Sequence, residues 1–205
     1  MTAVTRRWRF GDPVAALREV LARGGVVLFP TESSYAVGAD PRSAEGVEAV
    51  YRLKGRDRGK PLGVVVADEA QALELGVLPD DPAFRWACER WPAALSVLVE
   101  TRRRLPAMAG AERLSLRVPD HPALRRLLAE IGPLTATSAN QVGEAPMRDP
   151  REVERWARGA DHVVVDGGVL GGGPASTVVS WEVLPGGGGR PRVLRGGRFP
   201  LLPTQ

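Results

Sequence analysis

The sequence contains very little cysteine and histidine. Cys88 is the only cysteine among 205 residues, so we expect neither an intramolecular disulfide nor a cysteine-based zinc site. The two histidines, His121 and His162, lack the spacing of zinc ligands. No run of eighteen apolar residues exists, and segment 1–10 has three arginines without an apolar core, so neither a membrane span nor a secretory signal is expected. We therefore expect a cytoplasmic protein without a membrane partner.

Positive charge is in slight excess. The chain has 28 Lys and Arg against 24 Asp and Glu, which gives a net charge of +4 and favours anionic partners such as nucleotides or RNA. Segment 54–60 carries Lys54, Arg56, Arg58 and Lys60 at alternate positions, and an extended backbone would place all four side chains on one side. Such a row suits a polyanion, and a solvated basic loop is the alternative.

Helix starts are indicated by a capping residue before apolar residues at helical spacing. Asp12, Asp81 and Asp149 each precede a proline, the pattern of an N-cap followed by the first helical position. Segment 120–122 is a looser version of this signal, and Ser43 is suited to cap a helix that continues to residue 53.

Short β-branched runs predict strands between these helices. Because helices and strands alternate, we expect an α/β fold, as one domain over residues 1–205 with a mixed sheet and flanking helices. Short connections between the later strands indicate that part of the sheet is antiparallel. The glycine run within 185–191 is expected to be a flexible loop between two strands. The predicted strands are 26–29, 62–67, 95–100, 114–118, 163–165 and 177–181.

Small polar side chains follow two of the predicted strands. Thr31 and two serines come directly after 26–29, and Ser138 and Asn140 follow a later short strand. Ligands of open α/β sheets bind beyond the C-terminal ends of strands, so both bends are candidate sites for a small polar ligand. Capped turns are the alternative, because the same residue types are common in turns.

Arg117 lies within a strand of alternating apolar residues. An arginine in such a position is seldom buried without an anionic partner. A ligand carboxylate, held by two parallel hydrogen bonds, would suit it. A structural ion pair with Asp or Glu is the alternative.

Several common nucleotide and hydrolase motifs are missing. The glycine-rich stretch 166–173 does not match a P-loop, and neither does 55–60, where Pro61 replaces the required hydroxyl residue. No dinucleotide-binding fingerprint and no Gly-x-Ser-x-Gly elbow are present. The P-loop, Rossmann and usual α/β-hydrolase interpretations are therefore unsupported.

Six short motifs occur in the order found in the YrdC-like family, the threonylcarbamoyl-AMP synthases of tRNA modification. The chain resembles this family over roughly residues 10–200, and the ordered set is more specific than any single motif. The length fits the short form, without the extra C-terminal domain of longer members. The motifs are Pro30-Thr31-Glu32 with Tyr35 and Gly38; Leu53-Lys54-Gly55-Arg56 with Lys60-Pro61-Leu62; Arg117-Val118-Pro119-Asp120-His121-Pro122; Thr137-Ser138-Ala139-Asn140 with Gly143; Ala175-Ser176-Thr177-Val178; and Val193-Leu194-Arg195.

The resemblance implies a fold and a reaction. The family fold is a twisted, mostly open α/β sheet around a large basic cavity. L-threonine, bicarbonate and ATP would give threonylcarbamoyl-adenylate and pyrophosphate without a protein nucleophile, and Mg²⁺ would arrive with ATP. A partner complex would then pass the threonylcarbamoyl group to adenosine 37 of tRNA. Binding of tRNA or double-stranded RNA is a further implied property.

The resemblance also implies the residues that bind the ligands. A lysine-x-arginine pair and a serine-x-asparagine pair would hold the nucleotide, with further arginines near the phosphates. An arginine would bind the threonine carboxylate. The expected ATP-binding residues are Lys54, Arg56, Arg58, Arg113, Ser138, Asn140 and Arg195, and the expected threonine-binding residues are Thr31, Arg117, Thr137 and Ser176.

The chain departs from the family pattern in three places. Ala93 and Ala94 interrupt a Pro-Gly-Pro motif, Ala36 replaces a glycine, and Val65 lies near a position where many members have histidine. A divergent paralogue that acts on another small carbamoyl or amino-acid substrate is therefore one alternative. A non-catalytic RNA-binding or ribosome-maturation protein is a second, and a carbamoyl-transfer enzyme related to hydrogenase-maturation proteins is a third.

Overall fold

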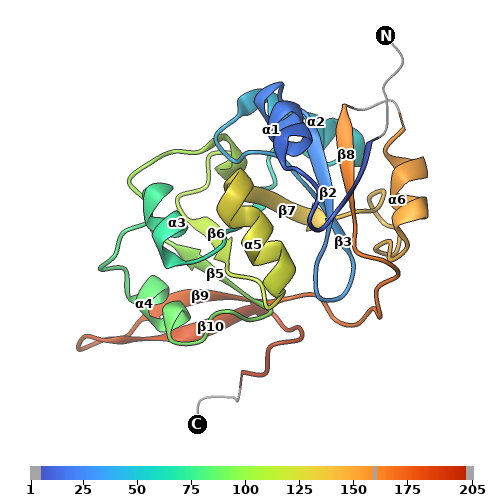
Figure 1. Cartoon of the computed structure of the whole chain (residues 1–205). Coiled ribbons are helices and arrows are strands. Elements are labelled where there is room, and N and C mark those ends of the chain that lie inside the picture. The colour runs from blue at the N-terminus through green and yellow to red at the C-terminus, as the bar shows by residue number, and fades with distance from the viewer. Residues whose placement is uncertain (1–5, 159–160, 202–205) are drawn as a thin grey trace.

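A computed structural model describes residues 6–158 and 161–201, and a single sheet of ten strands runs through them (Figure 1). The strands are β1 Arg6–Arg9, β2 Val26–Pro30, β3 Tyr35–Gly38, β4 Gly63–Val65, β5 Leu95–Val99, β6 Leu114–Arg117, β7 Leu134–Ser138, β8 His162–Asp166, β9 Thr177–Val183 and β10 Gly189–Arg195. The helices are α1 Ala15–Ala22, α2 Ala44–Lys54, α3 Glu69–Glu74, α4 Pro82–Cys88, α5 Pro122–Ile131 and α6 Pro150–Trp156, with a 3-10 helix at Pro106–Met108.

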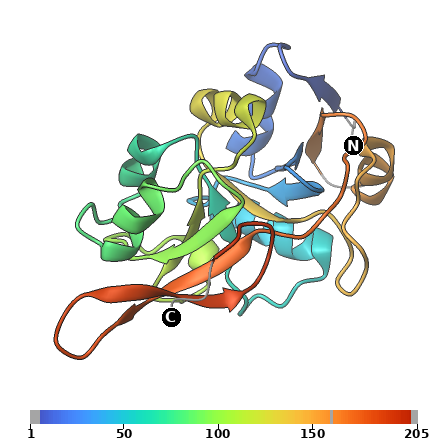
Figure 2. The same ribbon diagram turned by 90° about the horizontal axis from the view of Figure 1, so that it is seen from below.

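The sheet is mixed, with the strand order β1-β8-β2-β3-β7-β4-β6-β5-β9-β10. β8 is parallel to β1 and β2, β4 is parallel to β6, and β5 is parallel to β9. The other neighbouring pairs are antiparallel. β9 and β10 form a hairpin that projects from the rest of the molecule (Figure 2). The predicted α/β class with a partly antiparallel sheet is confirmed.

Helices pack against both faces of the sheet (Figures 1 and 2). Leu17 of α1 and Leu124 of α5 belong to one buried cluster with Val27 and Phe29 of β2. The apolar residues of α2, α4 and α6 belong to the other cluster, together with the alternate β2 residue Leu28. Since successive strand residues point to opposite faces, β2 is buried on both sides, which explains its uninterrupted apolar sequence.

Most of the predicted helix caps are present. Asp81 and Asp149 accept hydrogen bonds from the first turns of α4 and α6, and Ser43 caps α2. His121 Nδ1 caps α5 by accepting from Leu124 N at 3.1 Å. The prediction for Asp12 was wrong, because α1 begins only at Ala15 and the Asp12 carboxylate accepts from the backbone N–H of Arg9 instead.

The basic segment 54–60 does not form an extended row, so that arrangement was wrong. Lys54 is the last residue of α2, and Gly55 ends this helix in the left-handed conformation, with φ of 61°. Asp57 then folds the chain into a turn by accepting from the backbone N–H of Gly59. The cations consequently point in different directions, since a helix end followed by a turn has no two-residue repeat.

Candidate active site

An open cavity of about 760 Å³ collects most of the predicted polar residues. Residues of β3, β5, β6, β7 and β9 contribute to its lining. Among the described residues the lining includes four arginines and no acidic side chain. Seven of the predicted site residues line it, namely Thr31, Arg56, Arg117, Thr137, Ser138, Ser176 and Arg195.

Strand ends and strand pleating bring these residues together. Thr31 follows β2 and Ser138 ends β7, and the two bends meet because β3, which follows the first bend, pairs with β7. In β6, Leu116 is fully buried, whereas its neighbours Ser115 and Arg117 point to the opposite face and line the cavity. Polar residues that follow different strands therefore line one cavity.

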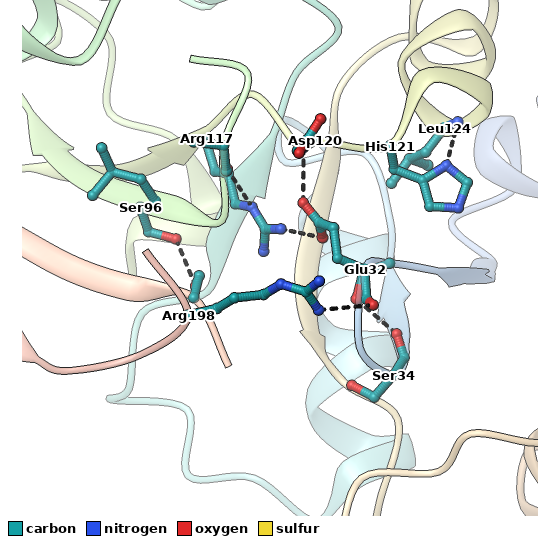
Figure 3. Close-up of polar contacts among 12 residues, drawn as sticks. Glu32, Ser34, Ser96, Arg117, Asp120, His121, Leu124 and Arg198 are labelled. Carbon is teal, nitrogen blue, oxygen red and sulfur yellow. Dashed lines mark hydrogen bonds and ion pairs between the residues drawn. The ribbon is translucent and has the colours of Figure 1, made fainter. Parts of the chain in front are cut away.

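Arg117 is held at the cavity wall by protein partners (Figure 3). It forms an ion pair with Glu32, and the two side chains are only 12% and 9% exposed. Arg117 Nε also donates to Ala93 O at 3.2 Å. The structural ion pair that the sequence left open is thus present, while Arg117 still lines the cavity.

Arg195 and Ser176 form a second polar group in the cavity. Arg195 Nη2 donates to Ser176 O at 2.9 Å and to Ser176 Oγ at 3.3 Å. Ser96 Oγ lies 3.1 Å from Ser176 Oγ and extends this network. Burial and the charge of Arg117 together lower the pKa of Arg195, so the two guanidinium groups are close enough to repel one another. An anion bound near both would relieve that repulsion.

Lys54 lies beneath the cavity rather than in it. Its side chain is 3% exposed, and Nζ donates to Asn140 O and Asn140 Oδ1, both at 2.9 Å, and to Ser138 O. Ser138 Oγ donates to the same Asn140 Oδ1 at 2.6 Å. Burial, followed by the charge of Arg56, lowers the pKa of Lys54 to about 8. Lys54 and Asn140 therefore fix the bend that presents Ser138 to the cavity.

Two predicted arginines lie away from the cavity lining. Arg58 forms an exposed ion pair with Glu48. Arg113 Nη2 lies 3.4 Å from Glu100 Oε1, and Arg113 Nη1 lies 3.5 Å from the carbonyl of Trp181. Neither side chain is brought together with Arg117 and Ser138 in this structure, so their contact with a ligand stays a prediction.

Other cavity residues were not singled out from the sequence. Ser96, Ser115 and Arg148 line the cavity, and Arg148 makes a long hydrogen bond of 3.5 Å to Gly171 O. Alternation within the predicted strands 95–100 and 114–118 marks both serines as facing away from the core, a usable signal. Arg148 stands in an irregular segment where no periodicity shows which way it points.

Tyr35 supports the glycine-rich loop at the edge of the same cavity. Its side chain is fully buried, and its hydroxyl accepts from Gly167 N and donates to Gly168 O, both at 2.9 Å. Burial raises the pKa of Tyr35 to about 12.

The described residues contain neither a cluster of metal ligands nor a helix that could span a membrane. In residues 6–158 and 161–201, no three His, Cys, Asp or Glu side chains are grouped so that they could hold a metal ion. No described helix has the length and apolar character needed to cross a membrane.

Comparisons with known proteins identify the family. The family model of the Sua5, YciO and YrdC domain, described as telomere recombination, matches residues 19–197. A threonylcarbamoyl-AMP synthase of Bacillus subtilis is 34% identical over 182 residues, which are 86% of this chain and 53% of the relative. This chain thus spans about half the length of that protein. A threonylcarbamoyl-AMP synthase of Thiobacillus denitrificans is 37% identical over 155 residues, which are 74% of this chain and 81% of the relative.

The fold is also similar to that of a solved structure. The crystal structure of P. abyssi Sua5 complexed with L-threonine is 25% identical, with a TM-score of 0.77 over 95% of this chain and 57% of that chain. Because the family model covers nearly the whole sequence and the relatives exceed 30% identity, the chain belongs to the Sua5/YciO/YrdC family.

Proposed function

We propose that this protein is a threonylcarbamoyl-AMP synthase, which converts L-threonine, bicarbonate and ATP to threonylcarbamoyl-adenylate and pyrophosphate. The observation that carries the proposal is the convergence of seven predicted ligand-binding residues on one cavity that contains arginines and hydroxyl groups. The names of the relatives support the same activity.

The proposed reaction needs positioning and charge stabilisation rather than a protein nucleophile. The threonine amine attacks the carbon of CO₂ and loses a proton, or attacks the carbon of bicarbonate with the loss of a water molecule, and either route gives a carbamate. A carbamate oxygen then attacks the α-phosphorus of ATP, and pyrophosphate leaves. Arg117, Thr31 and Ser176 would bind threonine, with Arg117 on its carboxylate, and Thr137 lies beside them in the cavity lining.

The nucleotide would be held by the remaining cavity residues. Arg56, Ser138 and Arg195 line the cavity, and the two arginines would stabilise charge that develops on the leaving pyrophosphate. Lys54 and Asn140 would act on the nucleotide through the bend at Ser138, since both are buried and bonded to each other.

The same proposal includes a metal ion, partners and a compartment. Mg²⁺ would enter with the ATP phosphates, which usually supply part of its coordination. The product would pass to a complex that modifies tRNA, so tRNA or double-stranded RNA and the proteins of that complex are proposed partners. The reaction would take place in the cytoplasm, where these substrates and tRNA are found together.

An assay with a panel of amino acids tests the proposal. Purified protein is incubated with ATP, Mg²⁺, bicarbonate and each amino acid, and pyrophosphate and the acyl-adenylate are measured by mass spectrometry. Threonine-dependent product of the expected mass is the predicted result. Turnover with a different amino acid would point to a divergent substrate, and tight RNA binding without nucleotide turnover would contradict the proposal.

The variant Arg117→Ala tests whether Arg117 binds threonine rather than ATP. We expect a loss of at least about tenfold in threonine affinity, because the carboxylate loses its charged partner, and little change in ATP affinity. Separate calorimetric titrations with threonine and with ATP measure the two effects. Equal losses for both ligands would mean that the role of Arg117 has been misassigned.

A further inference from the structure

Glu32 is an acidic side chain placed directly beside the arginine-lined cavity. It follows Thr31, and its ion pair with Arg117 is the most enclosed among the described residues, with exposed fractions of 9% and 12%. In every other ion pair of those residues, at least one side chain is 34% exposed or more. A buried pair of this kind needs good geometry to offset the loss of hydration of both charges.

The geometry around Glu32 holds Arg117 in one orientation (Figure 3). Glu32 Oε1 accepts from Asp120 N at 2.7 Å, while Oε2 faces Arg117 Nη2. On the other side of the guanidinium, Nε donates to Ala93 O. Burial raises the pKa of Glu32, but the charge of Arg117 and the hydrogen bonds outweigh burial and hold that pKa below its usual range. The carboxylate is therefore charged near neutral pH.

Arg117, Arg195 and Glu32 form a charged group with one net positive charge at this end of the cavity, and Arg198 Nη1 lies 3.4 Å from the backbone oxygen of Glu32. Arg117 and Arg195 contribute two positive charges that interact with each other, and Glu32 contributes one negative charge. One ligand carboxylate would neutralise this group. A second carboxylate on the same ligand, directed toward the buried Glu32 side chain, would be repelled by its negative charge.

We propose that Glu32 is a positioning and selectivity residue, which orients Arg117 and restricts this end of the cavity to amino acids with one carboxylate and an uncharged side chain. The proposal rests on the proposed function, since it concerns the amino-acid substrate of that reaction. It predicts that aspartate and glutamate are rejected because of charge, in addition to any effect of size.

Two substitutions separate charge from geometry. Glu32→Gln keeps the shape and the acceptor for Asp120 N but removes the charge, so we expect the preference for threonine over aspartate, measured as a ratio of kcat/KM, to fall by about tenfold or more. Glu32→Asp keeps the charge but is too short to hold Arg117 in place. For this variant we expect the preference to be retained while the KM for threonine rises and the KM for ATP stays unchanged.

Glu48→Gln is the matched control, because Glu48 also pairs with an arginine, Arg58, but outside the cavity lining. We expect this variant to keep the wild-type preference. Circular dichroism confirms that each variant is folded, and Glu32→Asp alone tests the positioning role if Glu32→Gln does not fold. A folded Glu32→Gln with wild-type preference and wild-type KM for threonine would overturn the proposal.

A direct binding measurement separates this proposal from the proposed function. Calorimetry with threonine and with aspartate is carried out on the wild type and on Glu32→Gln without any turnover. If the wild type binds threonine but makes no adenylate, the proposed reaction fails, and the proposal for Glu32 is judged from the two affinities alone. If the wild type binds aspartate as tightly as threonine, the proposal for Glu32 is wrong whatever the activity.

Discussion

The hydroxyl of Tyr35 connects the start of β3 to the glycine-rich loop that precedes β9. It bonds to both Gly167 and Gly168, so one side chain helps to order the start of this loop. The loop leads to Ser176, so the position of that cavity residue depends on a tyrosine far away in the sequence. The Ser176 hydroxyl then contacts Ser96 from β5.

We expect Tyr35→Phe to lower the free energy of unfolding by about 1–2 kcal/mol, because two backbone groups lose their partner. Hydrogen exchange of segment 167–176 should become faster. Tyr51→Phe is the matched control, since the hydroxyl of Tyr51 makes one hydrogen bond, to Lys60 O at 2.9 Å. Urea denaturation of both variants measures the difference. A cost for Tyr35→Phe no larger than that for Tyr51→Phe would refute the role of Tyr35 in ordering the loop.

The pKa of Tyr35 predicts an alkaline dependence of stability. Its value of about 12 in the folded protein lies above the ordinary value of 10.0, so folding favours the neutral phenol. The stabilisation is complete below pH 10 and is lost as the pH rises from 10 to 12. The free energy of unfolding of the wild type should therefore fall more steeply than that of Tyr35→Phe in this range. Parallel pH profiles would contradict the assignment.

Single residues also show which side-chain positions could be predicted from the sequence and which could not. Arg117 was predicted as a site residue from its place within an apolar strand and Ser138 from its place after a short strand, and both line the cavity. Lys54 was predicted as a nucleotide contact from its charge and from the family resemblance, and in the structure it is buried and bonded to the bend at Asn140. Charge and spacing do not reveal whether a lysine at a helix end points inward. That depends on acceptors such as Asn140, which the fold supplies from the bend after β7.

At the scale of elements, Asp81 joins a helix to a strand. Asp81 Oδ1 accepts from Ala83 N at 3.0 Å in the first turn of α4, and Oδ2 accepts from Glu100 N at 2.7 Å just after β5. The side chain is 6% exposed. This cap therefore fixes the position of α4 against the sheet as well as starting the helix.

We expect Asp81→Ala to cost about 2–4 kcal/mol, the sum of a lost cap and an unsatisfied backbone N–H. Asp149→Ala is the matched comparison, because the Asp149 carboxylate caps α6 with a bond to Arg151 N of the same helix. Its expected cost is about 1 kcal/mol. Urea denaturation measures both variants, and equal costs would mean that the bond to Glu100 contributes nothing.

Helices and strands whose own sequence carries a clear cap or strand pattern were predicted from the sequence. Others form because of contacts with distant parts of the chain. The Asp-Pro and Ser caps of α4, α6 and α2 follow local chemistry, β2 is apolar throughout, and β8 contains three consecutive valines. The short helix α3 was not predicted, although Asp68 caps it. β10 was partly assigned to a loop, because Gly189 and Pro191 disfavour a strand that pairing with β9 nevertheless stabilises.

At the scale of the whole molecule, the cavity joins the two ends of the sequence. Thr31 and Ser34 come from the N-terminal part, and Ser176 and Arg195 come from the last thirty residues or so. The central strands β4, β6 and β7 supply the lining between them. A ligand that contacts both groups would stabilise the whole sheet rather than one element.

We expect ATP and threonine to protect the protein against unfolding. A ligand at one hundred times its dissociation constant adds about 2.7 kcal/mol to the free energy of unfolding. Thermal unfolding with each ligand measures the effect, and hydrogen exchange should slow in both β3 and β9. Arg117→Ala should lose the stabilisation by threonine and keep that by ATP. Protection confined to β3 or to β9 would contradict a cavity shared by the two ends.

The strand order has a consequence for synthesis on the ribosome. β2 is made early, yet Val26 pairs with His162 of β8, and Leu95 of β5 pairs with Thr177 of β9. A nascent chain that stops after β7 therefore carries two strands with open edges and unpaired backbone groups. Translation must be nearly finished before these edges close, so a prematurely released fragment is a substrate for chaperones and proteases instead of a partly working enzyme.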